Sequence, residues 1–486
     1  MNKSRVSLLF GVLLAWPMVF AAAVPYQANG IKIGEVDSNS AIIWTRLTRE
    51  AESKSDGLEF PLVNYERDPN NPDRRYYPGP QIPEGHTLEE MDRVTPGAEG
   101  WVRLKVWPEN HTDQVIETEW AQVDPDRDFT HQFLLTNLEP DTTYHFVSEG
   151  KSDLQSEESS KVKGVLKTAQ VDDKPERVVF TVVTGQEYHR RDNPELGHQI
   201  YPVMSQLNPN FFVHTGDILY YDKAGPQALS VELARFKWNR IYGMPFQRAF
   251  HNRTPSYFIK DDHDTWQNDC WPTMENNKMG DFTFEEGQAI YLEQVPMGEK
   301  TYRTYRWGKD LQIWLVEGRD YRSPNDMPDG PEKTIWGKEQ MEWFKRTVEE
   351  SDAAFRLLIS PTPIVGPDRE NKHDNHANRD FKYEGDLIRQ FISEQKNMYV
   401  VCGDRHWQYV SVDPKTGVKE FCSGPTSEAH AGGFSQEDRS DMHRYLNICG
   451  GFLSGTVDRA DGKPTLTFRH HSVAGEILNE EVLRAE

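Results

Sequence analysis

Three carboxylate-rich turns in this chain each follow an apolar run of strand-forming residues. The turns are Gly216-Asp217-Ile218-Leu219-Tyr220, Asp261-Asp262-His263-Asp264 and Gly403-Asp404-Arg405-His406, after the runs 211–213, 257–259 and 399–401. Open α/β sheets bind their ligands at the carboxyl ends of their strands. Side chains of Asp, His and Tyr gathered at such an edge suit hard or borderline cations. The three turns therefore predict a metal site on an α/β sheet.

The residue types in these turns indicate separate roles around two cations. Asp217 can bridge both cations, because a carboxylate has two oxygens and about four lone-pair directions. Tyr220 could present a phenolate, which favours a hard trivalent metal such as iron. Asp262 and Asp404 offer oxygen ligands, and His406 offers a nitrogen.

His263 lies between the carboxylates of its own turn. Neighbouring negative charge raises the pKa of a histidine, so this side chain is suited to protonate a leaving alkoxide. Two cations beside it would polarise the oxygens of a phosphoryl group and activate water near neutral pH. The expected reaction is the hydrolysis of a phosphoric ester.

The first residues have the pattern of a secretory signal peptide. Lys3 and Arg5 precede the apolar stretch 6–20, and Ala21-Ala22-Ala23 offers small residues for cleavage. The alternative is a membrane anchor, but about 15 apolar residues are too few for a transmembrane helix. We expect residues 1–23 to be removed near Ala23, and the mature protein to be periplasmic or secreted through the general secretory route. We expect no transmembrane segment in the rest of the chain.

The chain is strongly acidic, with 77 acidic and 55 basic residues and a formal net charge of −22. Such a charge argues against binding nucleic acid or an anionic membrane through general electrostatics. An anionic substrate would instead need a local positive centre, which bound metal provides.

Four cysteines are present, and an exported chain permits disulfides. Cys422 and Cys449 both lie beside strand-like runs, so they are the first pair that we expect. Cys402, inside a strand, is expected to be a buried packing residue. For Cys270 a free thiol, a metal ligand and a disulfide partner all remain open.

Residues 24–172 have the pattern of a small β-sandwich. Inward and outward residues alternate over 41–46 and 101–107, and the pattern continues in 129–135 and 144–147. The segment from Leu138 to Tyr144 resembles the tyrosine corner of fibronectin-type-III-like sandwiches, in which the hydroxyl bonds to upstream backbone. Residues 51–100 interrupt the strands as an insertion. This insertion either leans over the active site or is a surface loop.

Strand and helix signals alternate after the linker at 171–175, which predicts a layered α/β domain over residues 173–486. This second region resembles the PhoD-like alkaline phosphatases, a branch of the calcineurin-like metallophosphoesterases. The resemblance is carried by the segments 214–220, 260–264, 317–322 and 402–406. The sandwich is similar to the N-terminal domain of that family, so the resemblance covers nearly the whole mature chain.

The resemblance implies a four-layered α/β/β/α core and hydrolysis of phosphomonoesters or phosphodiesters. It implies iron and calcium as the metal ions, with His263 near the leaving group. The ligands that it implies are Asp217, Tyr220, Asp262, Asp404 and His406.

One position departs from the family pattern. The first metal motif of the family is usually Ser-Cys-Gln, with the Cys as an iron ligand, and Gly185 stands in its place. Either Glu187 or His189 replaces the ligand, or water fills the position, or one metal is weakly held. Loss of a thiolate would lower the preference for iron relative to calcium or manganese. If glycine is not required there for a positive φ, Gly185→Cys is expected to tighten metal binding.

Several further polar residues are candidates for contact with the substrate. Arg319 is expected to act in catalysis by steadying the phosphoryl oxygens, because it follows a core strand toward the same sheet edge. The candidates for substrate binding are Arg190, Arg191, Arg322, Asn375 and His376. For the pair at 190–191, a solvated position is the alternative to a bidentate clamp on an anion.

These patterns predict an exported, metal-dependent hydrolase that acts on a small-molecule or polymeric phosphate ester. One alternative is a phosphodiesterase or phospholipase-D-like enzyme with little monoesterase activity. An alternative of another class is a non-catalytic protein that binds a polyanion or glycan and carries a degraded metal site. Retention of the other three motifs argues against this last alternative.

Overall fold

The computed structural model describes residues 23–62, 66–68, 71–76, 79–276 and 278–485. Nearly all of the predicted signal peptide lies outside these residues. Among the helices of the described chain, none is long and apolar enough to cross a membrane.

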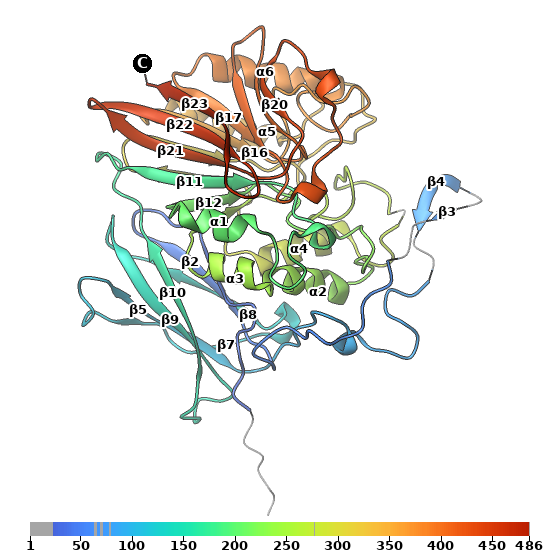
Figure 1. Cartoon of the computed structure of the whole chain (residues 1–486), viewed down its shortest axis with the longest axis vertical. Helices are drawn as coiled ribbons and strands as arrows, with labels where there is room; N and C mark the ends of the chain where they lie inside the picture. Colours follow the sequence, from blue (N-terminus) through green and yellow to red (C-terminus); the bar gives the residue numbers. More distant parts are fainter. Residues whose placement is uncertain (1–22, 63–65, 69–70, 77–78, 277, 486) are drawn as a thin grey trace, which may run out of the picture.

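A nine-stranded sheet is built from both halves of the chain (Figure 1). Its order is β23 (Ile477–Arg484), β22 (Lys463–His471), β21 (Phe452–Ala460), β11 (Val178–Val183), β12 (Phe211–His214), β13 (Ser256–Phe258), β1 (Ile31–Gly34), β2 (Ala41–Arg46) and β8 (Thr130–Leu135). β11, β12 and β13 run parallel, with Val213 opposite Tyr257. Their carboxyl ends therefore meet at one edge of the sheet.

A seven-stranded sheet faces the first one. Its order is β14 (Arg303–Trp307), β15 (Leu311–Leu315), β16 (Phe355–Ser360), β17 (Met398–Cys402), β19 (Lys419–Ser423), β18 (Gln408–Val412) and β20 (His443–Asn447). β15, β16, β17 and β19 are parallel neighbours. The turn that carries Asp404 follows β17, so this sheet also presents polar residues at the carboxyl end of a parallel strand.

Six α-helices in the described part of the chain cover these sheets. They are α1 (Ile200–Gln206), α2 (Val231–Tyr242), α3 (Pro245–His251), α4 (Phe284–Gln294), α5 (Gly337–Glu349) and α6 (Lys382–Ser393). Figure 1 shows α5 and α6 near the top of the molecule and α1 to α4 across its middle.

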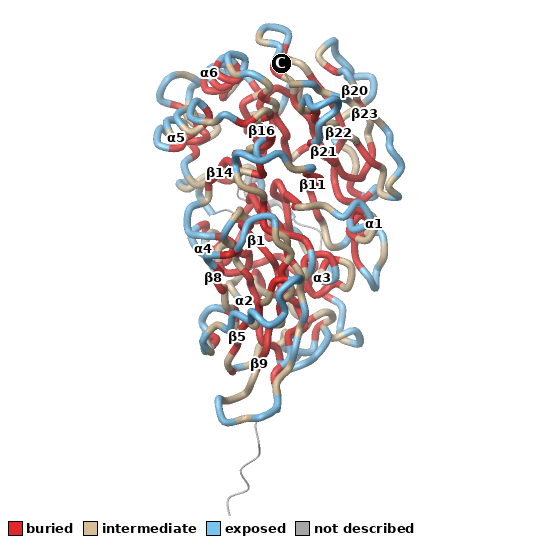
Figure 2. Tube along the Cα trace, turned by 90° about the vertical axis from the view of Figure 1, so that its left-hand side faces the viewer, coloured by how far each residue is buried: buried red, intermediate tan, exposed pale blue. Residues whose placement is uncertain are grey.

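Alternation along β12 shows how the layers are held together. Phe211 and Val213 belong to the core between the two sheets, whereas Phe212 packs with Tyr201 of α1 and Phe250 of α3. On the far side, α5 and α6 pack onto the seven-stranded sheet in a separate core cluster. Buried residues run along both sheets in Figure 2. The layers are therefore α/β/β/α, as the resemblance implied.

The N-terminal sandwich shares a sheet with the C-terminal α/β region. β1 pairs in parallel with β13, Gly34 lying opposite Ser256, so β1, β2 and β8 extend the nine-stranded sheet. The other sheet of the sandwich contains β10 (Ser160–Lys167), β9 (Thr143–Lys151), β5 (Trp101–Pro108), β6 (Ile116–Glu117) and β7 (Ala121–Gln122). The backbone N–H of Glu139 donates to the Tyr144 hydroxyl at 2.8 Å, which confirms the predicted tyrosine corner.

The insertion at 51–100 packs onto helix α2 of the C-terminal α/β region. Phe60, Met91 and Val94 form a small cluster with Leu233 and Phe236 of that helix. The short hairpin of β3 (Glu66–Asp68) and β4 (Asn71–Tyr76) projects to one side in Figure 1.

The four cysteines are buried free thiols, so the expected disulfide between Cys422 and Cys449 is wrong. Cys422 instead lies opposite Cys402 on the neighbouring parallel strand. Cys402 is fully buried, and its Sγ lies 3.1 Å from the Tyr409 hydroxyl. Cys270 is a free thiol without solvent exposure.

Candidate metal centre

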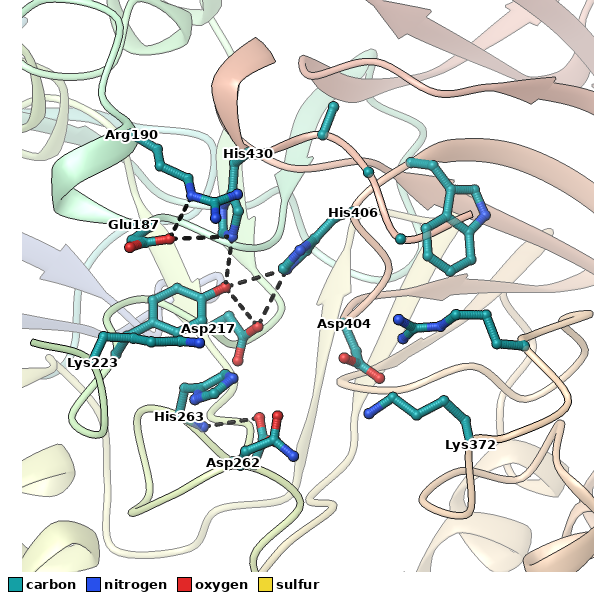
Figure 3. A pocket seen from close by; sticks show the side chains of 17 residues that line it. Glu187, Arg190, Asp217, Lys223, Asp262, His263, Lys372, Asp404, His406 and His430 are labelled. Carbon is teal, nitrogen blue, oxygen red and sulfur yellow. Dashed lines mark hydrogen bonds and ion pairs between the residues drawn. The ribbon is translucent and has the colours of Figure 1, made fainter. Parts of the chain in front are cut away.

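A cavity of about 430 Å³ lies where the carboxyl ends of the parallel strands of the two sheets converge (Figure 3). Eight of the residues singled out from the sequence line it. They are Asp217, Tyr220, Asp262, His263, Asp404, His406, Glu187 and Arg190. No described residue of the 51–100 insertion lines this cavity, so its described part does not form the cavity wall.

One side of the cavity gathers oxygen and nitrogen atoms around the Tyr220 hydroxyl. Its oxygen lies 2.9 Å from Asp217 Oδ2, 3.2 Å from His406 Nε2 and 3.3 Å from His430 Nε2. Burial lowers the pKa of His406 well below its ordinary value and that of His430 to about 3, so both imidazoles are neutral. The single phenolic proton is donated to the Asp217 carboxylate, so no group of the cluster carries a positive charge. This cluster is therefore short of positive charge, as expected for a cation site.

Asp217 connects this first cluster with a second one. Its Oδ2 faces Tyr220 and His406, the latter at 3.6 Å. Its Oδ1 is buried without a hydrogen-bond partner among the described residues. Asp217, Asp262 and His263 bring ligand atoms within 4.8 Å of one another. One oxygen thus stays available for each side, which fits a bridging carboxylate.

The backbone of the turns helps to aim these carboxylates. Asp217 has a φ of 55° and Asp404 a φ of 63°, in the left-handed region that is uncommon for residues other than glycine. The N–H of Asp404 donates to Thr184 Oγ1 at 3.0 Å, which ties the β17 turn to the end of β11. Local strain of this kind clusters at functional sites.

The second cluster is rich in negative charge. Burial raises the pKa of Asp217 and of Asp404, and neighbouring carboxylates add to the effect. Burial has the same effect on Asp262, but the cations of His263 and Arg319 lower the pKa of Asp262 below its ordinary value. Cations between these carboxylates would relieve their mutual repulsion, so the residues present fit the metals that the family implies.

His263 is held by a residue that the sequence analysis missed. Its Nδ1 lies 2.6 Å from Asp222 Oδ1, and the other oxygen of Asp222 lies 2.6 Å from Lys278 Nζ. Burial disfavours the charged imidazole, but attraction to the carboxylates of Asp222, Asp262 and Asp217 outweighs this effect and raises the pKa of His263 to about 9. This direction agrees with the sequence prediction. Asp222 follows Tyr220 by two residues, and that proximity was the signal available in the sequence.

Arg319 lies outside the cavity, which corrects its expected contact with the phosphoryl group. Its side chain is fully buried, and Nε and Nη2 each lie 2.6 Å from Asp261 Oδ1. Arg319 therefore acts behind the site, where it holds the turn before Asp262.

Five other candidates also point away from the cavity. Arg322 is buried, donates to Asn325 and lies over the Phe381 ring. Arg191 lies over Tyr188 and donates to the backbone carbonyls of Tyr188 and Pro194.

Asn375 and His376 are fully buried, Asn375 against Asp368 and His376 against Glu384. His189 does not line the cavity, and its Nε2 lies 3.1 Å from the Gly225 carbonyl.

Several basic and aromatic residues line the cavity without having been predicted. They are Lys223, Arg369, Lys372 and Trp407, together with Asn268 and His430. Lys372 lies 3.1 Å from Asp269 and 3.3 Å from Asp374, beside Asp404 in Figure 3. These six lining residues lie on loops and in turns and are not part of the strand-then-acid motifs, so hydrophobic periodicity did not indicate them.

Gly185 borders the first cluster directly. Its φ is +58°, and a Cβ placed there would lie 3.0 Å from His406 Nε2 and 3.5 Å from His430 Cε1. The position therefore faces the cation site, as the resemblance implied, but it requires a backbone conformation that favours glycine. The expectation for Gly185→Cys assumed that glycine is not required there for a positive φ, and this assumption is wrong.

A four-layered α/β/β/α core with this set of carboxylate, phenol and imidazole groups has the architecture of a metal-dependent phosphoesterase. The family profile described as PhoD-like phosphatase matches residues 180–447, and that described as PhoD-like phosphatase, N-terminal domain, matches residues 20–170. The chain therefore belongs to the PhoD-like phosphatase family, and it is a metal-dependent phosphoesterase.

Solved structures share the fold. A structure titled "Structure of PhoD" superposes with a TM-score of 0.70 at 16% identity, covering 95% of this chain and 90% of that one. Purple acid phosphatase PPD1 from seeds of yellow lupin (Lupinus luteus) gives a TM-score of 0.61 at 10% identity, covering 93% and 74%. Among curated proteins, no sequence matches.

Proposed function

We propose that this protein is exported and hydrolyses phosphoric mono- and diesters with two metal ions bridged by Asp217. The observation that carries the proposal is the placement of Asp217. One of its oxygens lies at the Tyr220 cluster, the other is buried without a hydrogen-bond partner among the described residues, and its ligand atom lies within 4.8 Å of those of Asp262 and His263. The predicted signal sequence at 1–23 supports the proposed export.

In this proposal Tyr220 and His406 hold one ion, and Asp262 and Asp404 hold the other. When bound, such ions lower the pKa of water and draw charge from phosphoryl oxygens. Iron and calcium follow from the family, and manganese also suits a site of oxygen and nitrogen donors. A metal analysis of the purified protein decides among them.

His263 is the proposed general acid. Since Nδ1 faces Asp222, Nε2 of the charged ring is free to give a proton to the leaving oxygen, and the carboxylate fixes the ring orientation. Arg190, half exposed at the rim and 2.9 Å from Glu187, is the predicted substrate-binding arginine that lines the cavity. Its guanidinium suits an anionic ester.

The assignment of Asp217 is tested with Asp217→Asn, which keeps the shape of the side chain. Metal content by elemental analysis and turnover of p-nitrophenyl phosphate should fall together, because the bridging charge is lost. Asp352→Asn, at an exposed carboxylate, is the matched control and should change neither. An Asp217→Asn protein with full metal content and full turnover would exclude Asp217 as a metal ligand.

Substrate preference and the acid are tested with esters of different leaving groups. His263→Ala should slow alkyl phosphates by about 10²–10⁴-fold and nitrophenyl esters far less, since a good leaving group needs no proton. Equal slowing of both would assign His263 to the ordering of the site. Hydrolysis of bis-p-nitrophenyl phosphate without the monoester would favour the phosphodiesterase alternative, and cell fractionation tests the proposed export.

A further inference from the structure

His430 lies in the wall of the cavity although no strand-end motif contains it. It closes the short 3₁₀ turn Glu428–His430, seven residues after β19, and it is 3% exposed. Its Nε2 lies 3.3 Å from the Tyr220 hydroxyl and 3.8 Å from Glu187 Oε2. The His406 ring lies beside it, with the ring centroids 4.0 Å apart.

The other nitrogen of His430 fixes the tautomer. Nδ1 lies 3.0 Å from the carbonyl oxygen of Gly185, which can only accept a hydrogen bond. The proton of the neutral ring is therefore on Nδ1, and Nε2 presents its lone pair to the cluster of Tyr220. Metal-binding histidines are typically held in this way, with the second ring nitrogen donating to a backbone carbonyl or carboxylate.

The end of β11 provides the space for this ring. Thr426 anchors the same loop by donating from its backbone N–H and its hydroxyl to the Gly185 carbonyl, at 3.2 and 3.1 Å. Because Gly185 has no side chain, the rings of His406 and His430 can approach its Cα. A Cβ would meet both of them.

The other candidates for a replacement ligand are less well placed. His189 is turned toward the Gly225 carbonyl, outside the cavity. Glu187 lines the cavity, but its Oε2 is paired with Arg190 Nε at 2.9 Å. Nε2 of His430, by contrast, faces the Tyr220 hydroxyl and Glu187 Oε2, and the His406 ring lies beside it.

We infer that His430 is a ligand of the ion held by Tyr220 and His406, and that its imidazole takes the place left by Gly185. This inference rests on the proposed two-metal function. The first ion then has a carboxylate, a phenol and two imidazoles as donors, with no sulfur. Such a set of nitrogen and oxygen donors suits iron, manganese, cobalt or zinc.

The test uses the full chain, stripped with chelator and titrated with Co²⁺ alone. His430→Asn removes Nε2 but keeps a side-chain N–H that can reach the Gly185 carbonyl, so the loop stays anchored. One of the two Co²⁺ affinities should fall by more than about 100-fold, because loss of an outer-shell partner costs roughly 10–100-fold. His189→Asn is the matched control and should bind like the wild type.

Proton NMR of the Co²⁺ protein separates a ligand from a neighbour. A coordinated imidazole gives an exchangeable, hyperfine-shifted N–H signal, and His430→Asn should lack one such signal that wild type and His189→Asn retain. Unchanged signals, or a fall in affinity within 100-fold, would overturn the assignment of His430 and leave the two-metal proposal standing. A wild-type protein that binds no Co²⁺ would overturn both. Circular dichroism checks that each variant is folded.

Discussion

Replacement of Arg319 by methionine should destabilise this protein strongly without lowering its affinity for inorganic phosphate. The Arg319 and Asp261 side chains are both fully buried, and two guanidinium nitrogens lie 2.6 Å from one carboxylate oxygen. Arg319→Met leaves this carboxylate buried without its cation. Removal of one partner from a buried ion pair costs about 3–5 kcal/mol.

The same reasoning predicts that a second substitution repairs part of the damage. In Arg319→Met/Asp261→Leu both charges are gone, and an apolar pair of similar volume is often neutral relative to a buried ion pair. The free energy of unfolding of the double variant should therefore exceed that of the single variant. The coupling energy from the complete double-mutant cycle measures the interaction.

Urea unfolding of the four proteins gives the free energies, and inhibition by inorganic phosphate gives the affinity of the site. We expect the inhibition constant of Arg319→Met to match that of the wild type, since Arg319 does not line the cavity. A fully stable Arg319→Met protein whose inhibition constant rises about tenfold, equivalent to about 1.4 kcal/mol, would refute the reasoning. Such a result would show that Arg319 contacts the bound phosphate.

Two further predictions concern the charge and the backbone of the site. In the metal-free protein, the pKa of His263 measured by NMR should be about 9, and it should fall in Asp222→Asn. Because the pKa in the unfolded chain is about 6.5, the protonated ring stabilises the fold fully below pH 6.5. This contribution to stability is lost as the pH rises through 9. An unaltered pKa in the variant would exclude the carboxylate as the cause. Gly185→Ala and Gly417→Ala should each cost about 1 kcal/mol, since both glycines have positive φ. Only Gly185→Ala should weaken metal binding, because its Cβ would reach His406 whereas nothing lies within 4 Å of a Cβ at 417. Equal metal affinities of the two variants would show that the contact with His406 does not affect metal binding.

The sequence was most informative where an apolar strand is followed at once by its functional turn. Asp217, Asp262 and Asp404 each lie within six residues of a buried strand end, and parallel pairing brings strand ends to one edge. The tyrosine corner was predictable for the same reason, since Tyr144 bonds to backbone only five residues upstream. Local patterns of this kind require no knowledge of distant contacts.

Residues whose orientation depends on distant partners could not be predicted in this way. Arg319 also follows a strand, but its guanidinium turns to Asp261, 58 residues away, and not to the cavity. His430 follows a strand by seven residues and reaches the site only because its loop bonds to Gly185, 245 residues away.

The sequence by itself determined the β-sandwich, the layered α/β region and the carboxylates, because side-chain periodicity and strand-end turns are local properties of the chain. Only the tertiary structure decided that the sandwich and the phosphatase region share one sheet through β1 and β13. It also decided that Asp222 orients His263 and that the ring of His430 fills the space beside Gly185. These outcomes depend on which buried donors and acceptors find partners across long stretches of sequence, and that is settled only when the sheets pack.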